Sequence, residues 1–155
     1  MPCTGWNGRW TRRAGAPPER LARSLLNLGS VEGRAGLLDA SVAHSQQALD
    51  IYRELGAQYY QAMALGNLAE AHLDSGEHTQ ARRFADEALT LLDGVDERLA
   101  ASDSLVVKGR ALAASGELPA ARDSWQRALR VLRRAGDPRA DEVAELLATH
   151  DDQPG

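Results

Sequence analysis

Residues 105–132, LVVKGRALAASGELPAARDSWQRALRVL, carry the pattern that decides the fold. Apolar and small residues recur at helical spacing on both sides of Gly116, and a glycine there favours the left-handed conformation that ends a helix. Pro119 suits the first turn of a following helix, where its missing N–H is not needed. The stretch therefore predicts two antiparallel helices joined by a short turn.

The same pattern occurs three times at a constant interval of about 40 residues. An Ala-Leu pair marks each copy. A glycine precedes each pair at a fixed distance, and another small residue lies at a fixed distance further upstream. The small and aromatic positions that define the repeat are Gly29, Ala48, Ala69, Ala81, Ala88, Gly109, Ala121, Trp125 and Ala128. Small residues allow two helices to cross closely, so we expect Gly109→Leu to cost about 1–3 kcal/mol by overpacking. A repeat of two helices predicts an all-α solenoid.

Seven helices are expected from the positions of the glycines, prolines and apolar faces. Their predicted bounds are residues 18–34, 38–55, 58–75, 78–93, 97–115, 118–135 and 139–149. The seventh helix has one apolar and one polar face, which a terminal cap of a solenoid needs. Residues 1–17 are predicted to be a disordered, Arg- and Gly-rich leader, and residues 150–155 a frayed tail. The domain therefore comprises residues 18–149, with repeats at about 22–61, 62–101 and 102–141.

The composition is that of one globular domain. The chain has 155 residues, of which 43% are hydrophobic and 26% charged, with a net charge of −4. A net acidic chain argues against direct nucleic-acid binding, and Trp6 and Trp10 in the leader are attributed to a flexible tail. Cys3 is the single cysteine, which excludes an internal disulfide and a cysteine metal site. No signal peptide and no apolar run of membrane-spanning length is present, so we expect a cytoplasmic protein without a membrane segment.

No pattern of catalytic or metal-binding residues stands out. Glu70, His72 and Asp74 do not share a helical face, so with His78 they do not form a metal site. His72 is expected to pack in the core instead. The sequence contains no Gly-rich phosphate loop and no strained nucleophile motif. We therefore expect no catalysis, no cofactor and no metal.

The repeat resembles the tetratricopeptide repeat (TPR), whose signature combines a large residue, Leu-Gly, an aromatic residue, Ala-x3-Phe and Pro. The chain differs from that family in its longer spacing, about 40 rather than about 34 residues. It also has Asp93 and Arg133 at the place of the proline. The third copy shows the resemblance in Leu105, Gly109, Leu112, Ala121-x3-Trp125 and Ala128.

Three further stretches are similar to the long repeats of bacterial transcription activators of the antibiotic-regulator and MalT type and of related signalling NTPases. These stretches are LLNLG at 25–29, QQALDIYRELG at 46–56 and LGNLA at 65–69. The resemblance implies a right-handed α-solenoid of three helix–turn–helix repeats plus a C-terminal capping helix.

In the TPR family the first helices of successive repeats line a groove. The family's facing positions imply three rows: Arg23, Asn27, Ser30 and Arg34; Met63, Asn67, Glu70 and Asp74; Asp103, Val107, Arg110 and Ala114. The candidates for partner binding are Arg23, Asn27, Arg34, Met63, Asn67, Glu70, Asp74 and Arg110.

Two alternatives remain open for the acidic pair Glu70 and Asp74. The carboxylates either receive a basic group of a partner, or Arg34 and Arg110 neutralise them within the chain. The paired Asn27 and Asn67 likewise either grip an extended peptide backbone or hydrogen-bond to a neighbouring helix.

The resemblance implies a protein–protein interaction module that binds a peptide or partner domain in the groove. A terminal-carboxylate clamp of the chaperone-binding type needs a lysine that the groove lacks. An alternative is a sensor or regulatory fragment of a bacterial transcription regulator, which binds an inducer or an adjacent domain. A third hypothesis is self-association through the first repeat, because the Arg-rich leader offers no amphipathic cap.

Overall fold

The computed structural model describes residues 15–93 and 98–151. Within these ranges the chain forms seven helices and no strand, which confirms the all-α prediction. The helices are α1 (Pro18–Arg34), α2 (Leu38–Leu55), α3 (Gln58–Asp74), α4 (His78–Leu92), α5 (Arg98–Ala114), α6 (Leu118–Ala135) and α7 (Arg139–Asp151). Every bound agrees with the sequence prediction to within two residues, and the largest difference is that α7 includes two residues of the predicted tail. Most of the predicted leader, with Trp6 and Trp10, lies outside the described residues.

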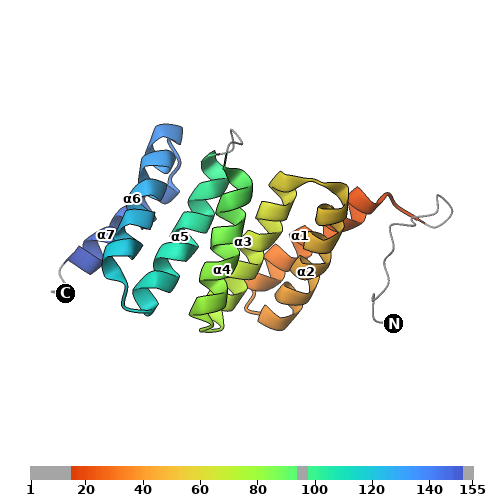
Figure 1. Cartoon of the computed structure of the whole chain (residues 1–155), viewed down its shortest axis with the longest axis horizontal. Helices are drawn as coiled ribbons and strands as arrows, with labels where there is room; N and C mark the ends of the chain where they lie inside the picture. Colours follow the sequence, from red (N-terminus) through yellow and green to blue (C-terminus); the bar gives the residue numbers. More distant parts are fainter. Residues whose placement is uncertain (1–14, 94–97, 152–155) are drawn as a thin grey trace.

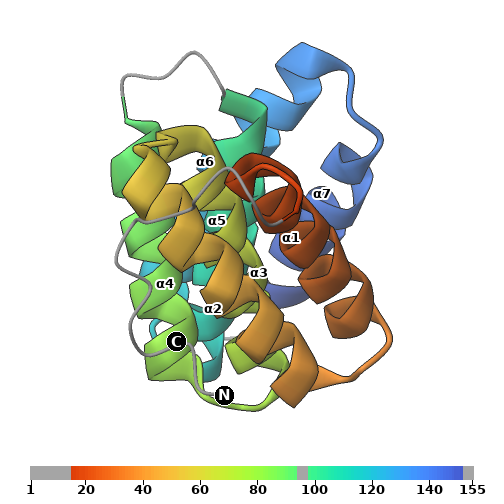
Figure 2. The same ribbon diagram turned by 90° about the vertical axis from the view of Figure 1, so that its right-hand side faces the viewer.

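The helices pack as antiparallel pairs that stand side by side in one row (Figure 1). Each helix contacts the next one along the chain, and α3 also contacts α1 and α5 (Figure 2 gives a second view of this arrangement). Among the described helices, α2, α4 and α6 make no comparable contact with one another. The surface formed by α1, α3 and α5 is therefore the inner side of the stack, which we call the groove.

The turn inside each repeat depends on a glycine with a left-handed backbone. Gly36, Gly76 and Gly116 have φ angles of 78°, 78° and 81°. In the third repeat the N–H of Glu117 donates to the carbonyl of Leu112 at 2.9 Å, and the first two repeats have the same bond. This 6→1 bond satisfies a carbonyl that the end of a helix otherwise leaves free. The glycine at each turn thus sets the length of the first helix.

The predicted close crossing of helices is present in the third repeat. A Cβ atom on Gly109 would lie 2.5 Å from Cδ1 and 2.8 Å from Cε2 of Trp125, whose side chain is completely buried. The indole Nε1 donates to the carbonyl of Val106 at 3.3 Å, so the ring has a fixed position. All positions that define the repeat are buried: Gly29, Ala48, Ala69, Ala81, Ala88, Gly109, Ala121, Trp125 and Ala128.

In the first repeat, serines lie at the equivalent crossing of the two helices. Ser41 donates its hydroxyl to the carbonyl of Gly29 at 2.7 Å, and Ser45 Oγ would overlap a Cβ placed on Gly29. The Ser45 hydroxyl is buried and has no hydrogen-bond partner among the described residues. The first crossing is therefore close but not fully satisfied.

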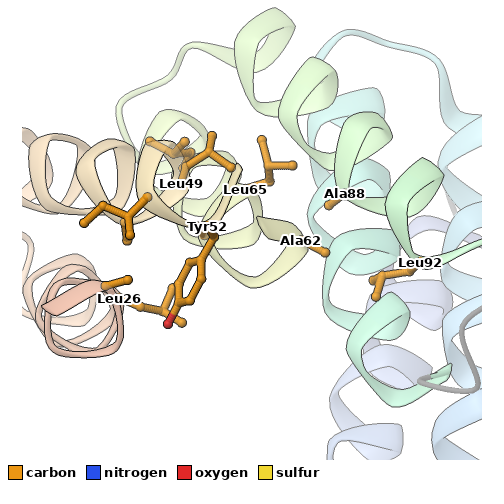
Figure 3. Packing of buried hydrophobic residues seen from close by; sticks show 12 residues of the cluster. Leu26, Leu49, Tyr52, Ala62, Leu65, Ala88 and Leu92 are labelled. Carbon is orange, nitrogen blue, oxygen red and sulfur yellow. The ribbon is translucent and has the colours of Figure 1, made fainter. Parts of the chain in front are cut away.

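Buried apolar side chains connect each repeat to the next. Figure 3 shows Leu49 and Tyr52 of α2 between Leu26 of α1 and Leu65 of α3. A second cluster surrounds Trp125 and extends into α7. A third, small cluster of Ala69, Ala85 and Val107 lies between the second and third repeats, so buried side chains join α3 to α5 as well. Within the described part of the chain, no helix combines the length and the apolar character that crossing a membrane requires.

Candidate functional site

Three carboxylates gather on the groove side where α3 approaches α5. Glu70 and Asp74 lie one turn apart on α3 and share a helical face, and Asp103 belongs to α5. Both Asp103 and Asp74 raise the pKa of Glu70, so both lie within electrostatic reach of its carboxylate. We call these three residues the acidic cluster.

The carboxylate of Glu70 carries the clearest electrostatic signal of the groove. Its residue surface is open to water, but protein atoms of the concave side displace much of the water around the carboxylate. This burial raises the pKa of Glu70 above its ordinary value, and Asp103 and Asp74 raise it further, against the opposing charges of Arg110 and Arg34. The groove therefore makes the ionised form of Glu70 costly.

The two arginines expected to neutralise the acidic pair lie near it without pairing. Arg34 and Arg110 both lower the pKa of Glu70, but among the described residues no cation lies within 4.0 Å of Glu70 or Asp74. Their compensation acts through space only. A charge that is partly desolvated and lacks a direct partner gains from an external cation.

Asp103 has a partner that sequence reasoning missed. Arg139, in the first turn of α7, donates from Nη1 to Asp103 and from Nη2 and Nε to Asp137, at 2.7 and 3.0 Å. Burial still raises the pKa of Asp103, whereas the side-chain bonds of Arg139 lower the pKa of Asp137 to about 2. The Asp137–Arg139 pair could be predicted, because the two residues are close in the sequence. The bond from Arg139 to Asp103 could not, because it joins residues 36 positions apart.

A small pocket of about 60 Å³ opens beside the acidic cluster, between α1 and α3. Arg34, Asn67, Glu70 and Asp74 are among the residues that line it, so the structure brings four of the predicted candidates together. A volume of this size holds about two water molecules or the charged end of one side chain. The pocket has room for the charged tip of a lysine or arginine side chain.

Asn27, Asn67 and Val107 occupy equivalent positions in the three repeats, on α1, α3 and α5, where the first helix of one repeat can face that of the preceding repeat. Asn67 Nδ2 donates to the carbonyl of Leu26 on α1 at 3.1 Å, which is the neighbouring-helix alternative. Val107 was expected in the groove, but it is only 4% exposed and packs against Ala69. Asn27 is exposed because no helix precedes α1 in the described part of the chain.

The remaining candidates do not line the small pocket beside the acidic cluster, although the charge of Arg110 still reaches Glu70. Met63 is half-buried against the core, and Arg110 lines a separate pocket of about 380 Å³ near Trp125. Arg23 lines a pocket that also contains Tyr52 and Tyr60. Sequence reasoning missed these tyrosines, although all three tyrosines of the chain fall between residues 52 and 60.

His72 packs as predicted. Its ring stacks on Phe84 with centroids 5.2 Å apart, and its Nδ1 lies 2.6 Å from Glu77 Oε2. Within the two described ranges, no group of three His, Cys, Asp or Glu side chains has the arrangement of a metal site.

Comparison with known proteins identifies the family. Two models of the tetratricopeptide repeat match the chain, one over residues 20–93 and the other over residues 103–127, and together they cover more than half of it. The chain belongs to the tetratricopeptide repeat family. Its TPR repeats indicate a protein-interaction scaffold.

A curated relative of this TPR chain is the regulatory protein AfsR of Streptomyces griseus. The two are 37% identical over 101 residues, which are 65% of this chain and 10% of AfsR. The chain thus spans about a tenth of the length of that relative. The predicted resemblance to the repeats of bacterial regulators is confirmed.

Solved structures show the same TPR fold at low identity. A Rap protein complexed with competence and sporulation factor aligns with a TM-score of 0.80 at 17% identity, over 86% of this chain and 37% of the Rap chain. The TPR domain of Arabidopsis FLU aligns with a TM-score of 0.71 at 15% identity, over 76% of this chain and 99% of the other. A TPR-like protein from Chlorobium tepidum gives a TM-score of 0.74 at 18% identity, over 85% and 92% of the two chains.

Proposed function

We propose that this chain is a non-enzymatic TPR module of the cytoplasm that binds a peptide or partner domain in its groove. The observation that carries the proposal is the state of Glu70, whose carboxylate is partly desolvated and has no cation within 4.0 Å among the described residues. A partner that brings a lysine or arginine to Glu70 and Asp74 removes this unfavourable state. The 60 Å³ pocket beside these residues has the size of one such charged group.

The rest of the groove supports an extended contact surface. Arg23 and Asn27 on α1 and Arg110 on α5 are exposed, and α3 lies between these helices. Three repeats offer enough surface for the roughly 800 Å² per partner of a standard interface. A helix or an extended segment laid across α1, α3 and α5 would contact both charge types. A Rap protein of the same fold forms a complex with competence and sporulation factor, which supports the binding of a protein or peptide partner by analogy of fold.

Charge reversal at the acidic cluster tests the proposal. The purified chain and its E70K/D74K variant are used as baits, and the captured proteins are compared by mass spectrometry. The matched control is the E54K/D123K variant, which changes the net charge equally at exposed positions of α2 and α6. We expect the control to capture the same partners as the original chain and E70K/D74K to lose them. Equal capture by all three baits would discard the groove as the binding surface.

A regulatory role is the second candidate, and the similarity to AfsR favours it. In this role the groove binds an inducer or an adjacent domain of a bacterial transcription regulator. Genes that encode a DNA-binding domain or an NTPase beside this gene would support the role. Calorimetric titration of such a domain with the chain and with E70K/D74K tests it, and an unchanged affinity in the variant would speak against the groove.

Self-association through the first repeat is the third candidate. Leu28 and Val31 on α1 are 42% and 54% exposed, whereas their counterparts in the second repeat, Leu68 and Ala71, are buried. Light scattering on the chain with and without residues 1–17, and on an L28Q/V31D variant, measures the mass in solution. We expect a dimer or larger species that becomes a monomer in the variant. A monomeric original chain would exclude this candidate.

A further inference from the structure

The pocket beside Arg23, Tyr52 and Tyr60 has a volume of about 310 Å³ and opens where the first turns of α1 and α3 meet the last turns of α2. We call it the tyrosine pocket, and its lining residues are Glu19, Arg20, Arg23, Tyr52, Leu55, Ala57 and Tyr60. Ten residues of α3 separate Tyr60 from Glu70, so the pocket lies about 15 Å from the acidic cluster along the helix. The two sites are therefore distinct.

One wall of the tyrosine pocket is aromatic. The rings of Tyr52 and Tyr60 stack with centroids 5.0 Å apart and an angle of 15° between their planes. Tyr60 is 43% exposed and Leu55 is 37% exposed, which leaves apolar surface open to water beside the buried Tyr52. Such a wall favours an aromatic or large aliphatic group that covers it.

The hydroxyl of Tyr52 is a donor without a partner among the residues that the structure describes. Tyr52 is only 3% exposed, yet it is one of the residues that line the tyrosine pocket. Figure 3 shows this hydroxyl pointing away from Leu49 and Leu65. Burial, followed by the effect of Tyr60, raises the pKa of Tyr52 above its usual value, so the hydroxyl is protonated at neutral pH and can donate. A donor of this kind gains from an acceptor supplied by a ligand.

The rim of the pocket is cationic. Arg20 and Arg23 are exposed, and among the described residues no carboxylate lies within 4.0 Å of either guanidinium. Arg23 lines the same pocket as Tyr52, and its charge opposes the rise in the pKa of Tyr52, so a cation lies within electrostatic reach of the hydroxyl. Glu19 is the single carboxylate in the described lining, so the two arginines leave a net positive charge. This charge favours an anion next to the Tyr52 donor.

We propose that the tyrosine pocket binds a carboxylate carried next to an aromatic ring, with the ring against Tyr60 and the carboxylate between Arg23 and the Tyr52 hydroxyl. The last residue of a partner peptide and a free aromatic acid both offer this chemistry. The site is independent of the groove contacts at the acidic cluster. It adds an anion-binding end to a surface whose other end binds cations.

The test uses the full chain labelled with ¹⁵N and two small probes, N-acetyl-L-phenylalanine and its neutral amide. We expect the acid to shift the amide signals of residues 19–23 and 52–60 with a dissociation constant on the order of 1 mM, as is usual for an anchor of this size. The amide should bind about tenfold more weakly because it lacks the charge-assisted bond. No shift with the acid, or equal binding of the amide, would overturn the proposal.

Variants assign the effect to the pocket. We expect R20Q/R23Q to weaken binding of the acid about tenfold, and Tyr52→Phe to weaken it several-fold while the thermal midpoint is unchanged. The matched control is R130Q/R133Q, which removes two exposed arginines from α6 and should bind like the original chain. If the control and R20Q/R23Q lost equal affinity for the acid, the effect would come from net charge alone, and the proposed site would be wrong.

Two further experiments distinguish a partner peptide from a small molecule as the source of the carboxylate, and the tyrosine pocket from the acidic cluster. An eight-residue peptide that ends in phenylalanine is compared with the same peptide amidated at its C-terminus. Binding of the free-ended peptide supports a partner terminus, and binding of the acid without the peptide supports a small molecule; either outcome supports the carboxylate site. The E70K/D74K variant should bind the acid normally, so failure of the groove proposal and failure of this one give different results.

Discussion

The crossing of α5 and α6 makes a quantitative prediction, because Gly109 lies against an indole that cannot move freely. In a Gly109→Ala variant the added methyl group would lie 2.5 Å from Cδ1 and 2.8 Å from Cε2 of Trp125. Real contacts of this kind need about 3.5–4.0 Å, so the helices or the ring must shift by roughly 1 Å. The ring is fully buried, and its Nε1 is bonded to Val106, so the shift affects the core and that hydrogen bond.

Opposing contributions set the magnitude for Gly109→Ala. Overpacking costs about 1–3 kcal/mol, and weakening the bond to Val106 costs about 1 kcal/mol. Replacing glycine inside a helix gives back about 1 kcal/mol, because alanine has the higher helix propensity. The free energy of unfolding should therefore fall by about 1–3 kcal/mol, which corresponds to a thermal midpoint about 3–9 °C lower.

Gly66 provides the matched control, because it lies inside another first helix, α3, and a Cβ placed on it would have no atom within 4 Å. Gly66→Ala should raise the free energy of unfolding by about 0.5–1 kcal/mol through helix propensity alone. Urea unfolding followed by far-ultraviolet circular dichroism measures both variants. If Gly109→Ala were as stable as Gly66→Ala, the close crossing would not exist and the account of the repeat would be wrong.

Three further predictions concern polar and charged side chains. Ser45→Ala should raise the free energy of unfolding by up to about 1 kcal/mol, because it removes an unsatisfied hydroxyl. Ser41→Ala should lower the free energy of unfolding by about 1 kcal/mol, because it removes the bond to the carbonyl of Gly29. Equal changes for the two variants in urea unfolding would contradict this. Glu70→Gln should raise the thermal midpoint at pH 7 but not at pH 4. The pKa of Glu70 is raised in the folded state, so the stability that this carboxyl contributes is present at low pH and is lost as the pH rises through that pKa. Arg139→Gln should return the pKa of Asp137 from about 2 toward 3.8. The lowered pKa contributes stability that is present above the ordinary pKa and lost as the pH falls toward 2, so the variant should lose this contribution and be less stable at neutral pH; a carboxyl signal that still titrates near 2 by NMR would refute the assignment.

The helices and their pairing follow from local and periodic signals. Gly36, Gly76 and Gly116 end helices because a glycine adopts a positive φ at little cost, and each acts within a few residues of sequence. The close contact of Gly109 with Trp125 is equally readable, because the constant interval between the copies shows that a small residue is required at that position in every copy. Features that depend on a few neighbouring residues, or that recur, could be predicted.

The contacts that shape the candidate sites were not predictable in this way. The bond from Asn67 to the carbonyl of Leu26 depends on the rotation of α3 against α1, and a rotation of a few tens of degrees would have placed the amide in the groove. The link from Arg139 to Asp103 depends on where α7 docks, which no spacing in the sequence encodes. Such contacts join residues more than 30 positions apart and occur once, so neither local pattern nor periodicity reveals them.

The repeat predicts which positions are equivalent, but function depends on how their surroundings differ. Positions 27, 67 and 107 are equivalent in sequence, yet the first is exposed, the second bonds to α1 and the third is buried. The same reasoning applies to Glu70, which lies in the central repeat. Glu70 has a first helix on each side, so it receives the field of Asp103 from α5 and that of Arg34 from α1, whereas a residue of α1 has a neighbour on one side only among the described helices. A carboxylate in the central repeat is thus influenced by charges on both neighbouring first helices, and a cationic partner gains by contacting it there.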